Sequence, residues 1–270
     1  MGRATADVVF VDGVRTPFGK AGSALAETRA DDLVVKVFRE LLRRNPDLPP
    51  ERIDDVAVAA TTQIGDQGLT IGRTASLLAG IPQSVPGYSV DRMCAGAMTA
   101  VTTLSSAIMA GAYDIALAGG VENMSRHPMG EAVDPNPRFL AERIVDMDAL
   151  SMGATAENLH DRFPQLTKER ADAFALGSQQ KTAHAYAEGW IQPDLVPVAM
   201  RSAEQGWGCI PVWGFGDVIE SNCTGTPGSE SSSRTHGGFD NDPYSMNSVL
   251  HRILGKQPTH PFEKRDLDYD

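Results

Sequence analysis

Residues 90–111 (VDRMCAGAMTAVTTLSSAIMAG) constrain the fold more than any other stretch of this chain. Their apolar side chains recur at helical spacing along one face, which predicts a strand end, a sharp turn and then a helix with one buried side. Cys94 stands at the front of that predicted helix. Unpaired backbone N–H groups and the positive end of the helix dipole favour negative charge there, and the thiolate is the nucleophilic form of cysteine. The stretch therefore makes Cys94 a candidate nucleophile, with a small buried apolar residue as the alternative.

Strands and helices are predicted to alternate around this stretch. The expected strands span residues 7–11, 55–60, 85–90 and 114–118, and the expected helices span residues 31–44 and 70–79 in addition to the Cys94 helix. Such alternation is typical of βαβ units and of a layered α/β/α sheet. It places Cys94 at the carboxyl end of a strand, where open α/β sheets bind their ligands. Farther along, we expect helices over 155–163 and 168–188 and a strand over 195–200.

The composition excludes several classes of function. The formal net charge is −11, which argues against nucleic acid or an anionic membrane as the main partner. The three cysteines, Cys94, Cys209 and Cys223, have neither a metal-binding spacing nor the pattern of a disulfide framework, so we expect no metal site and a reducing, cytoplasmic location. No apolar run approaches the length of a membrane span, and the first residues lack the pattern of a secretory signal.

Several motifs, in order along the chain, resemble the thiolase family. The segment 113–125 (YDIALAGGVENMS) is a predicted strand that ends in Gly119-Gly120, and it follows the Cys94 helix as in thiolases. The resemblance continues through residues 14–20 (VRTPFGK), 65–82 (GDQGLTIGRTASLLAGIP) and 151–157 (SMGATAE), and it covers about residues 7 to 208. It implies a thiolase-like layered α/β/α N-terminal domain with a loop subdomain, the second of the two similar thiolase halves being missing.

The resemblance divides the chain into three parts. Residues 1–124 correspond to the N-terminal α/β core, and residues 125–208 correspond to the loop region, which in thiolases covers the active site and binds coenzyme A. Met152, within the 151–157 motif, is the residue that we expect against the pantetheine arm of coenzyme A. Residues 209–270 resemble no part of a thiolase, and their Ser, Gly, Asp and Asn content is typical of a disordered tail.

By this resemblance the chain is an acetyl-CoA C-acyltransferase of the 3-ketoacyl-CoA type. Cys94 would attack the 3-keto carbon of a 3-oxoacyl-CoA and hold the acyl group as a thioester until a second CoA thiol collects it. Coenzyme A is then a substrate, and no tightly bound cofactor is expected. The resemblance also implies fatty-acid β-oxidation as the setting. It implies a homodimer or homo-oligomer as the assembly, because thiolases pair through their N-terminal halves.

The segment around Cys94 departs from the family pattern. Thiolases usually have Cys-x-Ser-Gly where this chain has Cys94-Ala95-Gly96-Ala97, and they often have Asn in place of Asp91. A carboxylate next to a thiol opposes formation of the thiolate unless the carboxylate is turned away. The orientation of Asp91 therefore bears on whether Cys94 can act as a nucleophile.

The sequence also departs from the family pattern in the groups that would assist Cys94. Thiolases carry an activating His in a Gly-His-Pro motif and an acid/base Cys in a Cys-x-Gly motif. Neither occurs in context here. Apart from the Cys94 turn itself, the letters Cys-x-Gly match only at Cys223-Thr224-Gly225, which lies in the polar tail. We therefore interpret the sequence as a truncated or frame-altered thiolase that is inactive by itself. The rival hypothesis is a non-catalytic acyl-CoA-binding or dimerising half-domain. A β-ketoacyl synthase is less favoured, because residues 14–20 and 119–125 are typical of thiolases.

The histidines of the predicted loop region have no role in this interpretation. His127, His160 and His184 fall on predicted loop or helix positions. We interpret all of them as solvated or packing residues.

Overall fold

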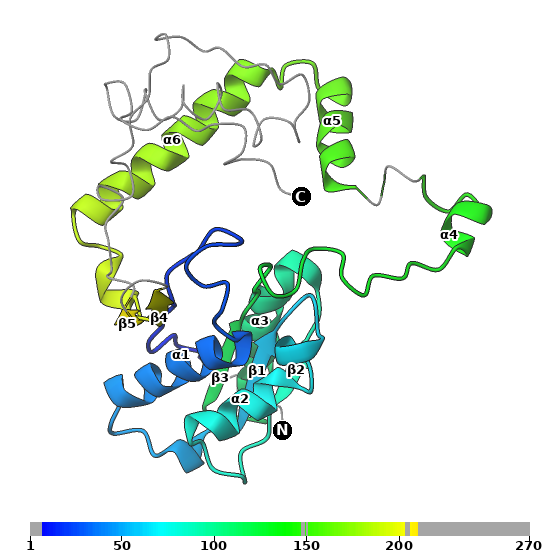
Figure 1. Ribbon diagram of the computed structural model, residues 1–270. Coiled ribbons are helices and arrows are strands. Elements are labelled where there is room, and N and C mark those ends of the chain that lie inside the picture. Colours follow the sequence, from blue (N-terminus) through cyan, green and yellow to red (C-terminus); the bar gives the residue numbers. More distant parts are fainter. Residues whose placement is uncertain (1–6, 147–148, 150, 203–205, 210–270) are drawn as a thin grey trace. The chain divides into compact units, whose positions relative to one another are not determined.

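The computed structural model describes residues 7–146, 149, 151–202 and 206–209, and the chain divides into two compact units (Figure 1). The first unit comprises the described residues up to Val133 together with those from Asp194 onward. The second unit comprises the described residues from Asp134 to Pro193. Apart from Cys209, the predicted polar tail lies outside the described residues.

A three-stranded parallel sheet forms the centre of the first unit. Its order is β2-β1-β3, so that β1 (Asp55–Ala59) lies between β2 (Tyr88–Val90) and β3 (Ala116–Gly120). All residues of β1 are buried, as its nearly continuous apolar run predicts for a parallel strand covered on both faces. The register sets Ala59 opposite Val90 on one side and opposite Gly120 on the other. The carboxyl ends of the three strands therefore lie at one edge of the sheet.

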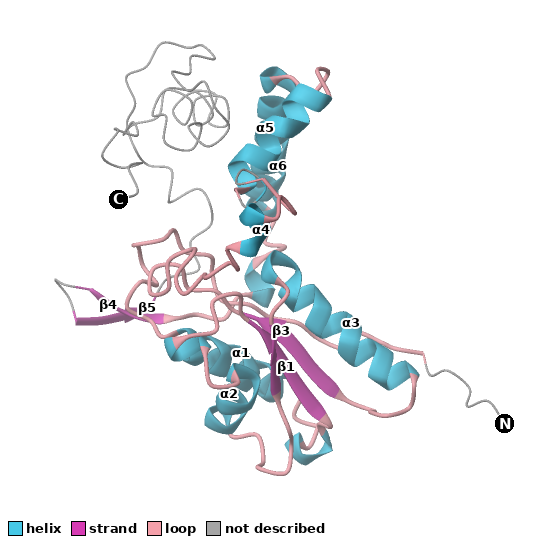
Figure 2. Cartoon of the chain, turned by 90° about the vertical axis from the view of Figure 1, so that its right-hand side faces the viewer, coloured by secondary structure: helices cyan, strands magenta, loops and turns pink. Residues whose placement is uncertain are grey.

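Helices cover both faces of this sheet, which gives the α/β/α layers that the sequence predicts (Figure 2). α1 (Ala30–Arg44) and α2 (Ile71–Ala79) lie on one face, and α3 (Gly96–Met109) lies on the other. The predicted helices over 31–44 and 70–79 and the Cys94 helix are confirmed, with bounds that differ by a few residues at most.

Two clusters of buried apolar side chains hold the layers together. The larger cluster joins α1 and α2 to β1, and Phe38, Val56 and Ile71 are among its members. The smaller cluster joins α3 to the opposite face and consists of Ala57, Ala100 and Leu104. Gly72 lets α2 lie close to the sheet, since a Cβ at this position would stand 2.1 Å from the carbonyl oxygen of Tyr88.

The start of α1 is stabilised by a residue that is distant in sequence. Arg29, the residue before the helix, makes no side-chain capping bond. Instead the carboxylate of Asp66, from another part of the chain, accepts a hydrogen bond from the Ala30 N–H at 3.2 Å. A carboxylate at this end of a helix satisfies an unpaired N–H and complements the positive end of the dipole.

Residues 7–11, predicted as the first strand, are not part of the sheet. They form an extended segment without strand pairing, and Val9, Phe10 and Val11 are 75%, 84% and 79% exposed. The prediction rested on apolar, β-branched composition, and such composition stabilises a strand only when a neighbouring strand supplies ladder hydrogen bonds and side-chain contacts. The described three-stranded sheet has β1 as its central strand and contains no residue of 7–11.

The last described part of the first unit is an antiparallel hairpin of β4 (Ala199–Ser202) and β5 (Gly206–Cys209). The predicted strand over 195–200 overlaps only the start of β4, and β5 was not predicted. Ahead of the hairpin the chain pairs with Arg15, whose N–H donates to the Asp194 carbonyl at 2.9 Å and whose carbonyl accepts from the Val196 N–H at 2.8 Å. These bonds tie the two stretches of the first unit together.

The second unit contains α4 (Arg138–Ala141), α5 (Met152–Arg162) and α6 (Lys168–Ala187) among its described residues. The last two confirm the predicted helices. Ser151 and Thr167 cap α5 and α6, because their hydroxyl oxygens accept from the N–H groups three residues ahead at 3.3 and 3.4 Å. No residue of α5 or α6 is buried. Within the part of the chain that the structure describes, every helix is too short or too polar to cross a membrane.

Candidate active site

Cys94 lies on a sharp turn between β2 and α3. After Val90 the chain passes through the single 3-10 turn η3 (Met93–Ala95), which leads directly into α3. Met93 has a φ of +48°, in the left-handed region that residues other than glycine rarely adopt. Cys94 comes next and is exposed. The thiol is therefore accessible at the front of α3, and the alternative of a buried packing cysteine does not describe it.

Asp91 is turned toward the backbone of this bend. Its Oδ1 accepts a hydrogen bond from the Met93 N–H at 3.0 Å. A short polar side chain that bonds a backbone group two residues ahead stabilises a turn of this kind. The carboxylate next to Cys94 thus takes part in shaping the turn that presents the thiol.

Small residues bring the front of α3 against the edge of the sheet. A Cβ on Gly96 would stand 2.8 Å from the Cβ of Ala59, and a Cβ on Gly120 would stand 2.9 Å from the Cβ of Ala97. Gly96 and Ala97 are the positions at which this chain departs from the Ser-Gly of the family motif. Both are in close contact with the carboxyl ends of β1 and β3, and this contact fixes the position of the turn that carries Cys94.

The loops after β1 and β3 are joined at the same edge by hydrogen bonds of one amide and one carboxylate side chain. The side chain of Gln67 is fully buried, and its Nε2 donates to Glu122 Oε1 at 2.7 Å while its Oε1 accepts from the Asn123 N–H at 2.6 Å. The other oxygen of Glu122 accepts from the Thr61 N–H at 2.7 Å. Glu122 and Asn123, which belong to the motif over 119–125, are therefore structural ties between the two loops.

His127 does not serve as a base in this site. Its Nε2 lies 2.5 Å from Asp66 Oδ1, and its Nδ1 lies 3.1 Å from Glu131 Oε2. With a carboxylate on each nitrogen, the ring has no free lone pair with which to accept a proton from a thiol. Of the two predicted roles of His127, solvated or packing, the structure excludes the first, because this ring is only 11% exposed and lies between two carboxylates.

Met152, the residue expected against pantetheine, is the first residue of α5 in the second unit. Its side chain is 77% exposed, so it is available to a ligand. Cys94 belongs to the first unit.

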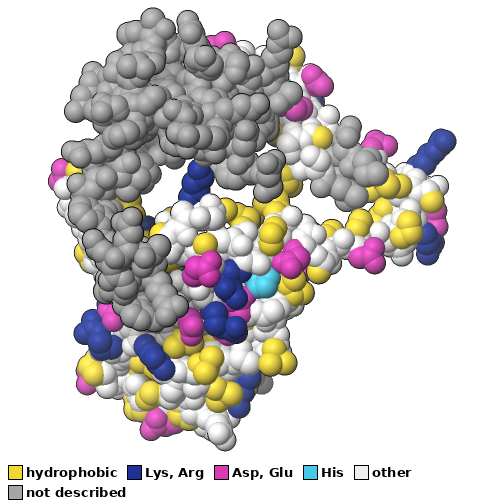
Figure 3. Space-filling model, in the orientation of Figure 1, with side chains coloured by type: hydrophobic (Ala, Val, Ile, Leu, Met, Phe, Trp, Pro, Cys, Tyr) yellow, Lys and Arg dark blue, Asp and Glu magenta, His cyan; other side chains and the backbone are white. Residues whose placement is uncertain are grey.

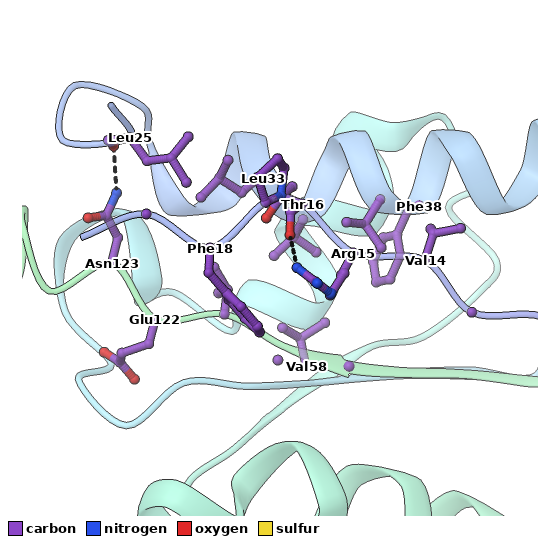
Figure 4. A pocket seen from close by; sticks show the side chains of 18 of the residues that line it. Val14, Arg15, Thr16, Phe18, Leu25, Leu33, Phe38, Val58, Glu122 and Asn123 are labelled. Atoms are coloured by element: carbon purple, nitrogen blue, oxygen red, sulfur yellow. Dashed lines mark hydrogen bonds between the residues drawn. The ribbon is translucent and has the colours of Figure 1, made fainter. Parts of the chain in front are cut away.

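A hollow of about 340 Å³ lies beside α1 in the first unit (Figure 4). Apolar side chains of α1, among them Leu33 and Phe38, line it together with the motif over 14–20 and the chain that follows β3. The Arg15 guanidinium stands 4.3 Å from the centre of the Phe18 ring, and Asn123 Nδ2 donates to the Leu25 carbonyl at 3.2 Å. The 14–20 motif therefore lines a hollow beside α1.

Among the described residues, no three His, Cys, Asp or Glu side chains lie close enough together to bind a metal ion. Cys223, His236 and His260 lie outside the described residues, as does the side chain of Cys209.

Comparisons with known proteins agree with the fold and with the motifs. The model of the thiolase N-terminal domain matches residues 8–209. The chain is 41% identical over 211 residues to a 3-oxoadipyl-CoA/3-oxo-5,6-dehydrosuberyl-CoA thiolase of Escherichia coli, a match that covers 73% of this chain and 52% of the relative. It is 37% identical over 218 residues to a 3-ketoacyl-CoA thiolase of Pectobacterium carotovorum, covering 80% of this chain and 55% of the relative.

A solved structure is similar as well. The acetyl-CoA acetyltransferase of Bacillus anthracis superposes with a TM-score of 0.64 at 26% identity, covering 83% of this chain and 60% of the other. The chain spans about half the length of the curated relatives that it matches. The match to the N-terminal domain over residues 8–209 shows that the chain belongs to the thiolase family.

Proposed function

We propose that this chain supplies the nucleophile of a thiolase-type acyl transfer. Cys94 takes the acyl group of a 3-oxoacyl-CoA, or the acetyl group of acetyl-CoA, and passes it to a CoA thiol. The observation that carries the proposal is the exposed thiol on the strained turn between β2 and α3, at the carboxyl edge of the sheet. Binding sites of open α/β sheets lie at this edge.

Cleavage of the substrate takes two steps. The Cys94 thiolate attacks the 3-keto carbon, the bond between the second and third carbons of the acyl chain breaks, and acetyl-CoA leaves as an enolate that takes up one proton. The CoA thiol then gives up its proton and attacks the Cys94 thioester, which releases the shortened acyl-CoA and restores the thiolate. Such covalent catalysis divides one difficult step into two easier ones.

The substrate class that we propose is a 3-oxoacyl-CoA. Two of the similar relatives are named for 3-oxoadipyl-CoA and for 3-ketoacyl-CoA, which differ in whether the acyl chain ends in a carboxylate. We propose that the substrate is a 3-ketoacyl-CoA whose acyl chain does not end in a carboxylate, and that the chain has a role in fatty-acid β-oxidation. Met152 on α5 is proposed as the contact for the pantetheine arm, and a cytoplasmic homodimer or homo-oligomer as the assembly.

We further propose that the 270-residue chain by itself is acylated without sustained turnover. The sequence has no Gly-His-Pro segment. General acid–base assistance in such steps contributes on the order of 10²–10⁴-fold. The alternative is a non-catalytic half-domain that binds acyl-CoA or another copy of itself, and it predicts no covalent adduct.

Mass spectrometry of the purified chain separates these proposals. After incubation with acetoacetyl-CoA or with 3-oxoadipyl-CoA, we expect an acyl adduct on the peptide that contains Cys94, no adduct in a Cys94→Ser variant, and little accumulation of acetyl-CoA. Absence of any adduct favours the non-catalytic alternative. Rapid turnover that is lost in Cys94→Ser contradicts the proposed inactivity and leaves the role of Cys94 intact. A stronger adduct from 3-oxoadipyl-CoA contradicts the β-oxidation assignment alone.

A further inference from the structure

A cluster of charged side chains joins separate segments of the first unit, apart from the Cys94 turn. Asp66 lies in η2 (Gly65–Gln67), and its partners Arg126 and His127 lie in the segment that follows β3. Glu131, which contacts His127, lies in the same segment. Figure 3 shows basic and acidic side chains gathered with a histidine on the face of the molecule drawn there. The mechanism proposed above uses none of these groups.

Asp66 is the buried centre of the cluster. Its side chain is 1% exposed, and it accepts hydrogen bonds from Arg126 Nε at 2.7 Å and from the Ala30 N–H at 3.2 Å, in addition to its contact with His127. A buried carboxylate without partners would be strongly destabilising, so all of these groups are needed in place. Through this one side chain, η2, the start of α1 and the segment after β3 are fastened together.

The ring of His127 faces two carboxylates. Nε2 lies 2.5 Å from Asp66 Oδ1, and Nδ1 lies 3.1 Å from Glu131 Oε2. A neutral imidazole has a single N–H, so one of its nitrogens would point a lone pair at a carboxylate, whereas an imidazolium donates to both. Protonation also balances the cluster, because two cations, Arg126 and His127, then meet two anions, Asp66 and Glu131.

The electrostatic environment agrees with this geometry. Burial by itself would lower the pKa of His127, but the hydrogen bonds to Asp66 and Glu131 outweigh it, and the pKa is raised above the ordinary histidine value. For Asp66, burial acts to raise the pKa, and the bonds from His127, Ala30 and Arg126 together lower it.

We propose that His127, held as an imidazolium between Asp66 and Glu131, is a pH-sensitive latch that fastens the segment after β3 to η2 and to the start of α1. The charged groups that face the pair are Arg126 on the same segment and Arg29 ahead of α1, which interacts with Asp66. Once the ring loses its proton, one of the two carboxylates that contact it faces a lone pair instead of an N–H donor. The root of the segment stays attached, because Gln67 and Asn123 hold it through bonds that do not titrate.

The sign of the pH effect follows from the raised pKa of His127. The stabilisation is complete below the ordinary histidine pKa of about 6.5 and is lost as pH rises through the raised value. Thermal unfolding of the full chain and of His127→Gln tests this at about pH 6 and about pH 9. We expect the variant to melt lower at the acid pH and the deficit to shrink at the alkaline pH. A control variant, His184→Gln, alters a histidine that is 60% exposed, and its effect should be small at both values.

A second measurement keeps the proposal testable if His127→Gln does not fold. Glu131 is 40% exposed, so Glu131→Gln removes one carboxylate with little change in packing. Side-chain NMR across the same pH range should show His127 titrating above the ordinary histidine pKa of about 6.5 in the unmodified chain, and at a lower pH in Glu131→Gln. Titration of His127 at or below that ordinary value, or an equal deficit of His127→Gln at both pH values, overturns the latch. Neither readout involves CoA or Cys94, so the outcome is independent of the proposed acyl transfer.

Discussion

The two units of this chain reach their helical structure by different physical routes. In the first unit, α1, α2 and α3 cover a parallel sheet, and residues such as Val56 and Ile71 are fully buried. In the second unit, α5 and α6 bury no residue, although both begin with a hydroxyl cap. α6 also has an ion pair one turn apart, between Lys168 and Asp172 at 2.9 Å.

The two units should therefore respond to different kinds of substitution. Most helical stability in proteins comes from packing of an apolar face, and local signals add tenths of a kcal/mol to about 1 kcal/mol each. The first unit should therefore respond strongly to changes in its core, and the second should respond mainly to changes in helix propensity and capping. Matched substitutions in the two units test this contrast.

The largest effect is expected from removal of a core side chain. Ile71→Ala deletes a fully buried side chain of α2 and should lower the free energy of unfolding by about 2–5 kcal/mol. Phe174→Ala removes a larger side chain from α6, but that ring is 81% exposed, and the expected change is within about 0.5 kcal/mol. Urea denaturation followed by circular dichroism measures both. Comparable losses in the two variants would contradict the contrast between the units.

Replacing a glycine by alanine should change the free energy of unfolding in opposite directions in the two units. Gly72→Ala places a methyl group 2.1 Å from the Tyr88 carbonyl oxygen, a backbone atom, so we expect destabilisation of about 1–3 kcal/mol. Gly177 lies within α6 with no atom near its missing Cβ, and Gly177→Ala should stabilise that helix by about 0.5–1 kcal/mol. The same denaturation experiment applies, and destabilisation by Gly177→Ala would show that α6 packs against a surface.

Loss of a helix cap should affect the second unit alone. Thr167→Ala removes the hydroxyl that accepts from the Arg170 N–H, at a cost of about 1 kcal/mol to α6. Because this helix has no buried residue to compensate, its helicity should fall measurably while the first unit is unaffected. Thr167→Ser retains the oxygen and serves as the control. Equal helicity in Thr167→Ala and Thr167→Ser would mean that the cap contributes nothing.

Local patterns in the sequence predicted much of this structure. The apolar face, acidic start and basic end of α1 are all local signals, and the helix begins one residue from the predicted position. The turn ahead of Cys94 was also predicted from a local pattern, a strand followed directly by a helical repeat of apolar residues. The prediction of a strand over residues 7–11 was wrong, because a strand requires a partner that its own composition does not specify.

The charged cluster could not be predicted, because its partners are distant in sequence. Asp66 and His127 are separated by 61 positions, and Asp66 is 36 positions from the helix start that it caps. His127 and Glu131 are only four positions apart, but no helix was predicted there to bring such a pair together. The Met93 conformation was also not predicted, although the short polar side chain of Asp91 two residues earlier was a signal for a turn.

The most direct test of the central claim is to measure which cysteine reacts. The purified chain is treated briefly with iodoacetamide, with and without prior incubation with acetyl-CoA, and the labelling of Cys94, Cys209 and Cys223 is compared by peptide mapping. An exposed thiol at the front of α3 should be alkylated first, and acetyl-CoA should protect Cys94 alone by forming a thioester. Equal labelling of Cys94 and Cys223, unchanged by acetyl-CoA, would contradict the assignment of Cys94 as the acyl-accepting nucleophile.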